Sequence, residues 1–344
     1  MEFLANLDFW FTVLRCTTPV LLATMAALIA SRSGLLNLGL EGTMTISALC
    51  GVLGSGFTGS LFVGAVAGLA SGTLYTMLLA YFIQHLKANQ VITGVALNLA
   101  ATGGSVFCLY SLTGDKNASN SLPSAAFPAV DIPVLKDIPG LGQILSGHNC
   151  LTYLAFIIAV IMFIMLKRTA FGIRIRAVGE SAEAARSVGI NVERVRYQAM
   201  FISGILASLG GMYLSMGYVN RFTANMVAGR GYVALATNAM AAGNALMGMV
   251  SSILYGFGSG ISIYLQNNNV DPYLITIIPY ASIIIFYVAF SFYYKVKKKA
   301  DRNEFEGCRQ ELDSPDCFPG LCLWQACPRE DSMSGSETCR VQGL

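Results

Sequence analysis

Residues that could do acid–base or metal chemistry are scarce in this chain. Its two histidines, His85 and His148, fall in segments that the charge pattern below places on opposite sides of a membrane, so a histidine triad or a histidine metal site is not expected. The sequence contains no Gly-Lys dipeptide, and hence no Walker A loop, and no G-x-S-x-G or H-E-x-x-H motif. We predict that the chain is not an enzyme and that it holds no metal or cofactor.

Glu41 is the residue whose position is most informative for function. It is the only carboxylate well inside the first four apolar runs, about seven residues or roughly 10 Å past the start of its predicted helix. A charge at such depth costs several kcal/mol unless it faces protein or a water-filled path. Two interpretations stay open: Glu41 lines a transport path, or it holds two helices together through hydrogen bonds. Asn37 is predicted four residues earlier, on the same helical face.

Amide side chains within the apolar runs are the other candidates for a solute path. They are Asn98, Asn238 and Asn244, and their alternative role is to hydrogen-bond neighbouring helices. Three glycines between residues 34 and 42 could interrupt the helix around Glu41 and free backbone groups towards a cavity. Because every Lys and Arg lies in a loop or near the end of an apolar run, such a path would suit a neutral, hydroxyl-rich solute.

The stretch 167–196 is a polar island, with seven Lys or Arg and three Glu in a chain that is only 12% charged. Short loops rich in Lys and Arg stay in the cytoplasm. Ser181 is placed to cap a helix, Glu183 lies in its first turn, and Gly189 supplies a left-handed stop, which predicts a helix over Ala182–Val188. A mere connector does not need such a helix, so we interpret it as a docking element for another protein.

Apolar content defines the class of protein that positions these residues. Hydrophobic residues make up 54% of the chain and the mean hydropathy is +0.58, while soluble domains carry about 25% charged residues. Runs of about 20 apolar residues are long enough to cross a bilayer. We predict an all-α polytopic membrane protein with about nine transmembrane helices, at 9–30, 35–56, 59–83, 90–113, 149–166, 198–217, 232–248, 250–266 and 272–294.

Charge placement predicts the orientation of these spans. The island at 167–196 and the lysine cluster at 295–299 both favour the cytoplasm, which requires an even number of crossings between them. Counting 232–266 as two spans meets this requirement and predicts an N-out, C-in topology. Arg221 and Arg230 are then the exceptions to the positive-inside rule.

The chain divides by composition into one membrane domain and a tail. Residues 1–295 hold all the predicted spans, with the cytoplasmic loop 167–197 between two of them. Residues 296–344 are basic at first and then rich in cysteine. This tail has no histidine and no closely spaced cysteine pair, so we expect a disordered segment and not a zinc site.

Three segments together resemble a known family. They are SRSGLLNLGLEGTM at 31–44, ANQVITGVALNLAA at 88–101 and TAFGIRIRAVGESAEAARSVGIN at 169–191. In order and spacing they are similar to permeases of ATP-binding cassette (ABC) importers of the branched-chain amino acid and ribose type, most of all to the nucleoside and simple-sugar branch. The resemblance covers residues 10–295, and the tail adds no support to it.

The resemblance implies a multi-pass permease of a bacterial cell membrane that has no ATPase activity of its own. Such a subunit works in the lipid bilayer, without nucleic acid, together with a second permease (a copy or a different chain), two ABC ATPase subunits and an extracytoplasmic substrate-binding protein. It also implies that the segment from Gly179 to Asn191 docks on the ATPase. The candidate coupling residues are Gly179, Glu180, Glu183, Ala184 and Gly189.

These observations predict the permease subunit of an ATP-driven importer that forms a path for nucleosides, whose ribose hydroxyls would meet Asn37, Asn98 or Asn238. Simple sugars or branched-chain amino acids are alternative substrates. An ion-coupled secondary transporter, with Glu41 as its coupling carboxylate, and a channel or scaffold subunit are alternative classes. The capped helix in the basic loop favours the ATP-driven class, and the lack of several buried carboxylates disfavours proton coupling.

Overall fold

The computed structural model of this protein describes residues 7–115, 117–122, 124–129, 146–266, 275 and 277–292. The chain forms two compact units, Met1–Phe286 and Tyr287–Leu344. The predicted tail at 296–344 lies outside the described residues. The described residues are helical with connecting loops, and their only β pairing is two isolated bridges, Ala118–Thr223 and Ala129–Asn149.

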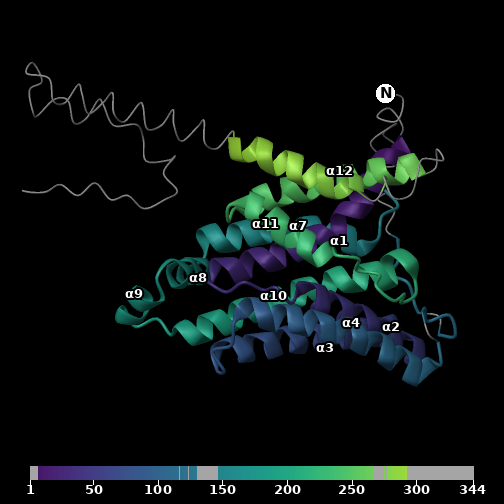
Figure 1. Ribbon diagram of the computed structural model, residues 1–344, viewed down its shortest axis with the longest axis horizontal. Helices are drawn as coiled ribbons and strands as arrows, with labels where there is room; N and C mark the ends of the chain where they lie inside the picture. Colours follow the sequence, from purple (N-terminus) through teal and green to yellow (C-terminus); the bar gives the residue numbers. More distant parts are fainter. Residues whose placement is uncertain are drawn as a thin grey trace, which may run out of the picture. The chain divides into compact units, whose positions relative to one another are not determined.

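The helices follow one another along the chain, with the longest connection between α4 and α7 (Figure 1). Their bounds are α1 Leu7–Arg32, α2 Leu40–Thr58, α3 Leu61–Gln84, α4 Gln90–Thr113, α7 Cys150–Arg168, α8 Ala170–Glu180, α9 Ala182–Ser187, α10 Val192–Met212, the π-helical η2 Tyr213–Val219, α11 Arg230–Ala241 and α12 Ala245–Gln266. A further apolar helix covers Ile277–Phe292.

Six of the described helices are long and apolar enough to cross a membrane. They are α1, α3, α4, α7, α10 together with η2, and α12. The remaining predicted spans correspond to α2, α11 and Ile277–Phe292. The 19 residues of α2 include many Gly, Ser and Thr, and the 12 residues of α11 extend only about 18 Å.

Four predicted span boundaries are wrong by five residues or more, and they have local causes. The second helix begins at Leu40 and not at 35, because the chain turns at Gly34, whose φ is +79°. Helix α10 begins at Val192 and not at 198, because the Asn191 side chain accepts a hydrogen bond from the Arg194 amide at 3.0 Å and caps it. Helix α11 ends at Ala241 and not at 248, because the two residues after Ala241 are left-handed, and α12 begins directly after this turn, at Ala245 and not at 250.

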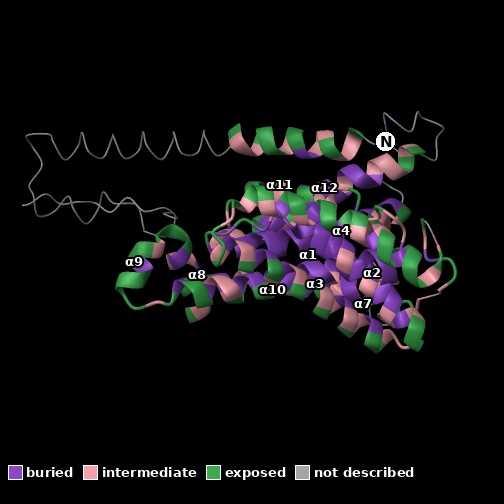
Figure 2. Cartoon of the chain, turned by 60° about the horizontal axis from the view of Figure 1, so that its bottom comes forward, coloured by how far each residue is buried: buried purple, intermediate pink, exposed green. Residues whose placement is uncertain are grey.

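Helix α1 is the centre of the first unit. Every residue from Thr17 to Ala30 is buried, and α10, α11, α12 and α7 all pack on this helix (Figure 2). The predicted loop at 167–197 contains more helix than expected, because α8 fills the stretch between α7 and α9. Figure 1 shows α8 next to the end of α1, and α9 farther out, beyond α8.

Contacts along α1 give the direction of each neighbouring helix. Helix α10 runs opposite to α1, because Arg196 Nε donates to the Ser33 carbonyl at 3.4 Å and Tyr213 donates to the Arg15 carbonyl at 3.2 Å. Helix α12 also runs opposite, with Gly248 against Met25 and Gly260 against Phe9 and Val13. Helix α11 runs the same way as α1.

The direction of α11 follows from two hydrogen bonds. Thr237 pairs with Thr24 at 2.6 Å between their hydroxyl oxygens, while Arg32 donates to the carbonyl of Ala242 at 3.1 Å. The two helices therefore advance together towards the end of α1 at Arg32. Helix α11 begins seven residues before Thr237, at Arg230, so its start is level with the middle of α1 and not with either end.

Helix α2 also begins at the level of the middle of α1. Gly211 of α10 lies against the Met44 carbonyl, and the neighbouring Gly210 lies against Pro19 and Leu22 of α1. The 26 residues of α1 continue to Arg32, well beyond this level. Two helices thus start midway along the bundle and run in opposite directions, each preceded by a non-helical segment, 33–39 for α2 and 220–229 for α11.

Candidate functional site

The Glu41 carboxylate joins the two helix starts. Its Oε1 accepts a hydrogen bond from the Gly229 amide at 2.8 Å, and its Oε2 accepts one from the Gly231 amide at 2.8 Å. Gly229 is the N-cap residue of α11, with a φ of +79°, and Gly231 lies in the first turn. Only 8% of Glu41 is exposed. A buried carboxylate is satisfied here by backbone donors, as a buried charge requires.

Helix dipoles make this position favourable for an anion. The first N–H groups of a helix have no partner within the helix, and they carry a partial positive charge. The starts of α2 and α11 both lie at Glu41, so one negative charge faces two positive helix ends. A carboxylate in such a partly buried position contributes up to about 2 kcal/mol to stability.

Asn98 of α4 completes the arrangement with three hydrogen bonds. Its Oδ1 accepts from the Gly42 amide of α2 at 2.8 Å, and its Nδ2 donates to the Leu38 carbonyl at 2.8 Å and to the Tyr232 hydroxyl at 2.9 Å. Asn98 therefore connects α4 to both helices that start midway along the bundle, α2 and α11. We call the group Glu41, Asn98, Gly229, Gly231 and Tyr232 the polar junction.

Asn37 lies beside the polar junction, and the prediction of its backbone is wrong. It is not helical and does not share a helix face with Glu41, because the chain from Gly34 to Gly39 is irregular. Its Nδ2 donates to the Ser203 hydroxyl at 2.9 Å, and that hydroxyl donates to the Ala26 carbonyl at 2.8 Å. The Oδ1 of Asn37 is buried and accepts no hydrogen bond from the described residues.

The last two asparagines lie away from the polar junction. Asn238 donates to the Ser31 hydroxyl at 3.2 Å, near the end of α1. Asn244 is exposed, and its Oδ1 accepts from the Leu246 amide at 3.2 Å at the start of α12. Of the five candidate path residues, the structure therefore brings Glu41 and Asn98 together.

Sequence reasoning missed the α11 side of the polar junction. The sequence feature that could have indicated it is the run Gly229-Arg230-Gly231-Tyr232, in which two glycines flank the start of a short helix. Arg230 lies at this buried level, not in an outer loop, and its Nη1 donates to the carbonyls of Met226 at 3.0 Å and Val227 at 3.1 Å. The Arg230 guanidinium thus stabilises the loop that precedes α11.

The helix predicted in the basic loop is present as α9. The Ser181 hydroxyl accepts from the Ala184 amide at 3.3 Å, and Gly189 has a φ of +82°. Two backbone bonds close the other end, from Gly189 to the Arg186 carbonyl and from Ile190 to the Ala185 carbonyl, both at 3.0 Å. This pairing is a Schellman motif, which ends a helix at a left-handed residue.

The five candidate coupling residues all belong to the α8–α9 region. Glu180, Glu183, Ala184 and Gly189 are exposed, while Ala185 packs into the core cluster around α1 and holds α9 in place. Gly179, at the end of α8, lies directly against the end of α1, and a Cβ atom there would overlap the Arg32 carbonyl oxygen. The ATPase-binding role of these residues remains a prediction.

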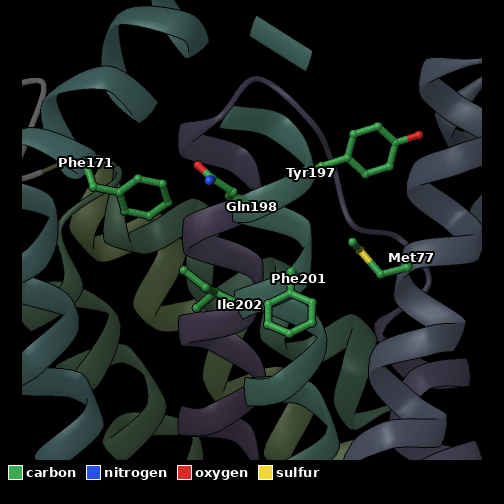
Figure 3. A pocket seen from close by; sticks show the side chains of 6 residues that line it. All are labelled: Met77, Phe171, Tyr197, Gln198, Phe201 and Ile202. Atoms are coloured by element: carbon green, nitrogen blue, oxygen red, sulfur yellow. The ribbon is translucent and has the colours of Figure 1, made fainter. Parts of the chain in front are cut away.

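A separate cavity of about 430 Å³ lies between α3, α8 and α10 (Figure 3). Its lining is apolar except for the Gln198 amide and the Tyr197 hydroxyl, and it contains no candidate site residue. Among the described residues no three His, Cys, Asp or Glu side chains gather as metal ligands would. The polar junction and the α8–α9 region are therefore the two candidate sites.

Comparisons with known proteins agree over most of the chain. Residues 9–304 match the family described as branched-chain amino acid transport system / permease component. The guanosine ABC transporter permease protein NupQ of Bacillus subtilis (strain 168) is 32% identical over 252 residues, which cover 71% of this chain and 78% of that protein.

Two further relatives differ in the solute for which they are named. The nucleoside ABC transporter permease protein NupC of Lactococcus lactis subsp. cremoris is 29% identical over 256 residues, covering 72% of this chain and 79% of that protein. The putative glucose ABC transporter permease protein TsgC13 of Haloferax volcanii is 32% identical over 258 residues, covering 74% and 76%.

Proposed function

We propose a function from the premise that this chain belongs to the branched-chain amino acid transport system / permease component family: it is the membrane-spanning permease subunit of an ATP-driven importer of nucleosides. The observation that carries the proposal is the similarity to two permeases named for guanosine and for nucleosides, over more than 70% of this chain in each case. The relative named for glucose keeps simple sugars as the alternative substrate class.

The chemistry of the polar junction supports a neutral solute. Tyr232 is 46% exposed and offers its hydroxyl group, while Asn98 is buried and uses its amide group to hold Tyr232 and α2 in place. The only carboxylate here is bound by two backbone amides, and the Arg230 guanidinium is bound by carbonyls of its own loop. A ribose hydroxyl suits the Tyr232 hydroxyl group, whereas a charged amino acid lacks a free counter-ion. Asn37, Asn238 and Asn244 belong to the proposed path as supporting residues.

The helix directions support the full topology that the charges predict. We propose nine crossings with the N-terminus outside and the C-terminus inside, in a bacterial plasma membrane. The segment 220–229 and α11 together make one crossing, because α12 then returns along the whole length of α1. In this topology the segments 33–39 and 220–229 enter the membrane from opposite sides and meet at Glu41.

The exposed helix α9 is proposed to dock on an ABC ATPase. Residues 1–295 then form the permease domain and 167–197 its cytoplasmic coupling loop, with Gly179, Glu180, Glu183, Ala184 and Gly189 at or near the contact. A second permease chain and an extracytoplasmic substrate-binding protein complete the importer. Transport is driven by the ATPase, and this chain supplies the path.

Uptake measurements test the substrate. In cells that express the complete importer, we expect labelled adenosine or uridine uptake to be reduced by unlabelled nucleosides and to be unaffected by leucine or ribose. Loss of uptake in a strain without the ATPase gives the control for ATP-driven transport. Competition by leucine would assign the amino acid branch, competition by ribose alone would assign sugars, and uptake without the ATPase would contradict the proposed class.

Substitution of Gly189 tests the coupling role of α9. Gly189→Val places a β-branched residue at a φ of +82°, which costs about 1–2 kcal/mol and should undo the end of α9. We expect the permease to insert normally while ATPase association and uptake fall. Gly189→Asn is the matched control, since asparagine tolerates the left-handed region and should keep both. Normal ATP-driven uptake with Gly189→Val would show that the shape of α9 is not needed.

A further inference from the structure

Arg32, the last residue of α1, binds the end of α11. Its Nε donates to the Gly243 carbonyl at 2.9 Å, and its Nη2 donates to the Ala242 carbonyl at 3.1 Å. A guanidinium with two donors in a fixed plane can hold two successive carbonyls at once, which a lysine ammonium does less well. A cation is also favoured at this position because the end of a helix carries partial negative charge.

The α11 end that Arg32 binds has an unusual backbone. Ala242 and Gly243 are both left-handed, with φ values of +47° and +80°, and they make the whole connection between α11 and the residue before α12. Alanine rarely adopts this conformation, because its Cβ approaches the following carbonyl. The two carbonyls that Arg32 binds are therefore those of the tight turn itself, and the guanidinium fixes where α11 ends.

The other side of Arg32 faces α8. The Gly179 backbone lies so close to the Arg32 carbonyl that a Cβ atom there would overlap it. The charged groups that act on Arg32 are Arg176 and Glu180, both on α8. Behind this contact, Arg196 of α10 donates to the Ser33 carbonyl at 3.4 Å. Arg32 thus contacts both α8, which leads to α9, and the end of α11, whose start lies at the polar junction.

We propose that Arg32 is a positioning residue that transmits movement of α8 and α9 to α11. The proposal rests on the proposed function, in which an ATPase moves α9. Helix α11 is a 12-residue rod, bound at its start by Glu41 and at its end by Arg32, with a non-helical segment before it and a tight turn after it. A shift of α8 displaces Arg32, tilts this rod, and changes the distance between α11 and α4 at the polar junction.

Distance measurements in the assembled importer test the proposal. Spin labels at Ala239 on α11 and Thr102 on α4, both exposed positions, report the separation of the two helices with and without ATP and vanadate. In the otherwise native complex we expect the distance to change on nucleotide trapping. In Arg32→Met we expect this distance to stay the same on nucleotide trapping, while ATPase binding and ATP hydrolysis are retained. Uptake should fall about tenfold, which is a usual size for coupling between sites. Lys87→Met removes an exposed basic side chain elsewhere and should behave as native.

The outcomes separate this proposal from the proposed function. A native complex without ATP-driven uptake would overturn the proposed function itself. If the distance between the labels changes on nucleotide trapping in the native complex and changes equally in the Arg32→Met complex, the role of Arg32 alone is overturned. If Arg32→Met does not assemble, Arg32→Lys gives the test, because it keeps the charge but loses the two-donor geometry; an unchanged distance response and unchanged uptake in that variant would overturn the proposal.

Discussion

Replacing Glu41 with glutamine should lower the stability of the protein by about 2–3 kcal/mol, because the NH2 group that replaces one carboxylate oxygen cannot accept a hydrogen bond and one buried backbone N–H loses its partner. The negative charge that faces the two helix starts is lost as well. We expect the melting temperature in detergent to fall by several degrees and uptake to fall with it, since the start of α11 is no longer fixed to α2.

Glu183→Gln is the matched control for this substitution. It makes the same chemical change in an exposed residue of α9, where no buried donor depends on the carboxylate, and should leave the melting temperature unchanged. An unchanged melting temperature in Glu41→Gln, combined with an altered KM for the solute, would contradict the structural role and would favour the interpretation in which Glu41 faces the transport path.

Replacing Gly231 with alanine should have a comparable or larger effect for a steric reason. An added Cβ would lie 2.6 Å from the Glu41 backbone nitrogen and 2.8 Å from its Cα and from its Oε2. These distances are too short for any side chain, and two of the three atoms belong to the backbone, so α2 and α11 must separate. Overpacking of this kind costs about 1–3 kcal/mol and sometimes more. We expect loss of thermal stability and of uptake, measured as for Glu41→Gln.

Gly103→Ala makes the same change where the structure leaves open space. Gly103 lies within α4, and a Cβ atom there meets nothing within 4 Å. Alanine is favoured over glycine in a helix by about 1 kcal/mol, so this control should be neutral or stabilising. If Gly231→Ala were as stable as Gly103→Ala, the close approach of α11 to the start of α2 would be wrong.

Local features of the fold could be predicted from the sequence. Ser181 and Gly189 carry signals that act within a few residues of the chain, and α9 has the cap and the stop that they predict. The apolar runs predicted the long helices, because each run must bury its backbone polar groups in hydrogen bonds of its own. The resemblance in three segments predicted the family.

The polar junction could not be predicted in the same way. Glu41 and Gly229 are 188 residues apart in the chain, and hydrophobic periodicity does not indicate which helices meet. The depth of Glu41 suggested a partner or a cavity but not its identity. The predicted position of Asn37 is wrong because the predicted helix starts at residue 35, whereas α2 begins only after Gly39. Non-local packing decided both cases.

The shortness of α11 has a consequence for how the protein enters the membrane during synthesis. Twelve residues that include Asn238 and Thr237 are too few and too polar to partition into lipid from the translocon unaided. Its partners are on α1, through Thr24, Ser31 and Arg32, which the ribosome makes some 200 residues earlier. Insertion of α11 therefore depends on its contacts with α1, which is made first, and with α12, which packs against both helices.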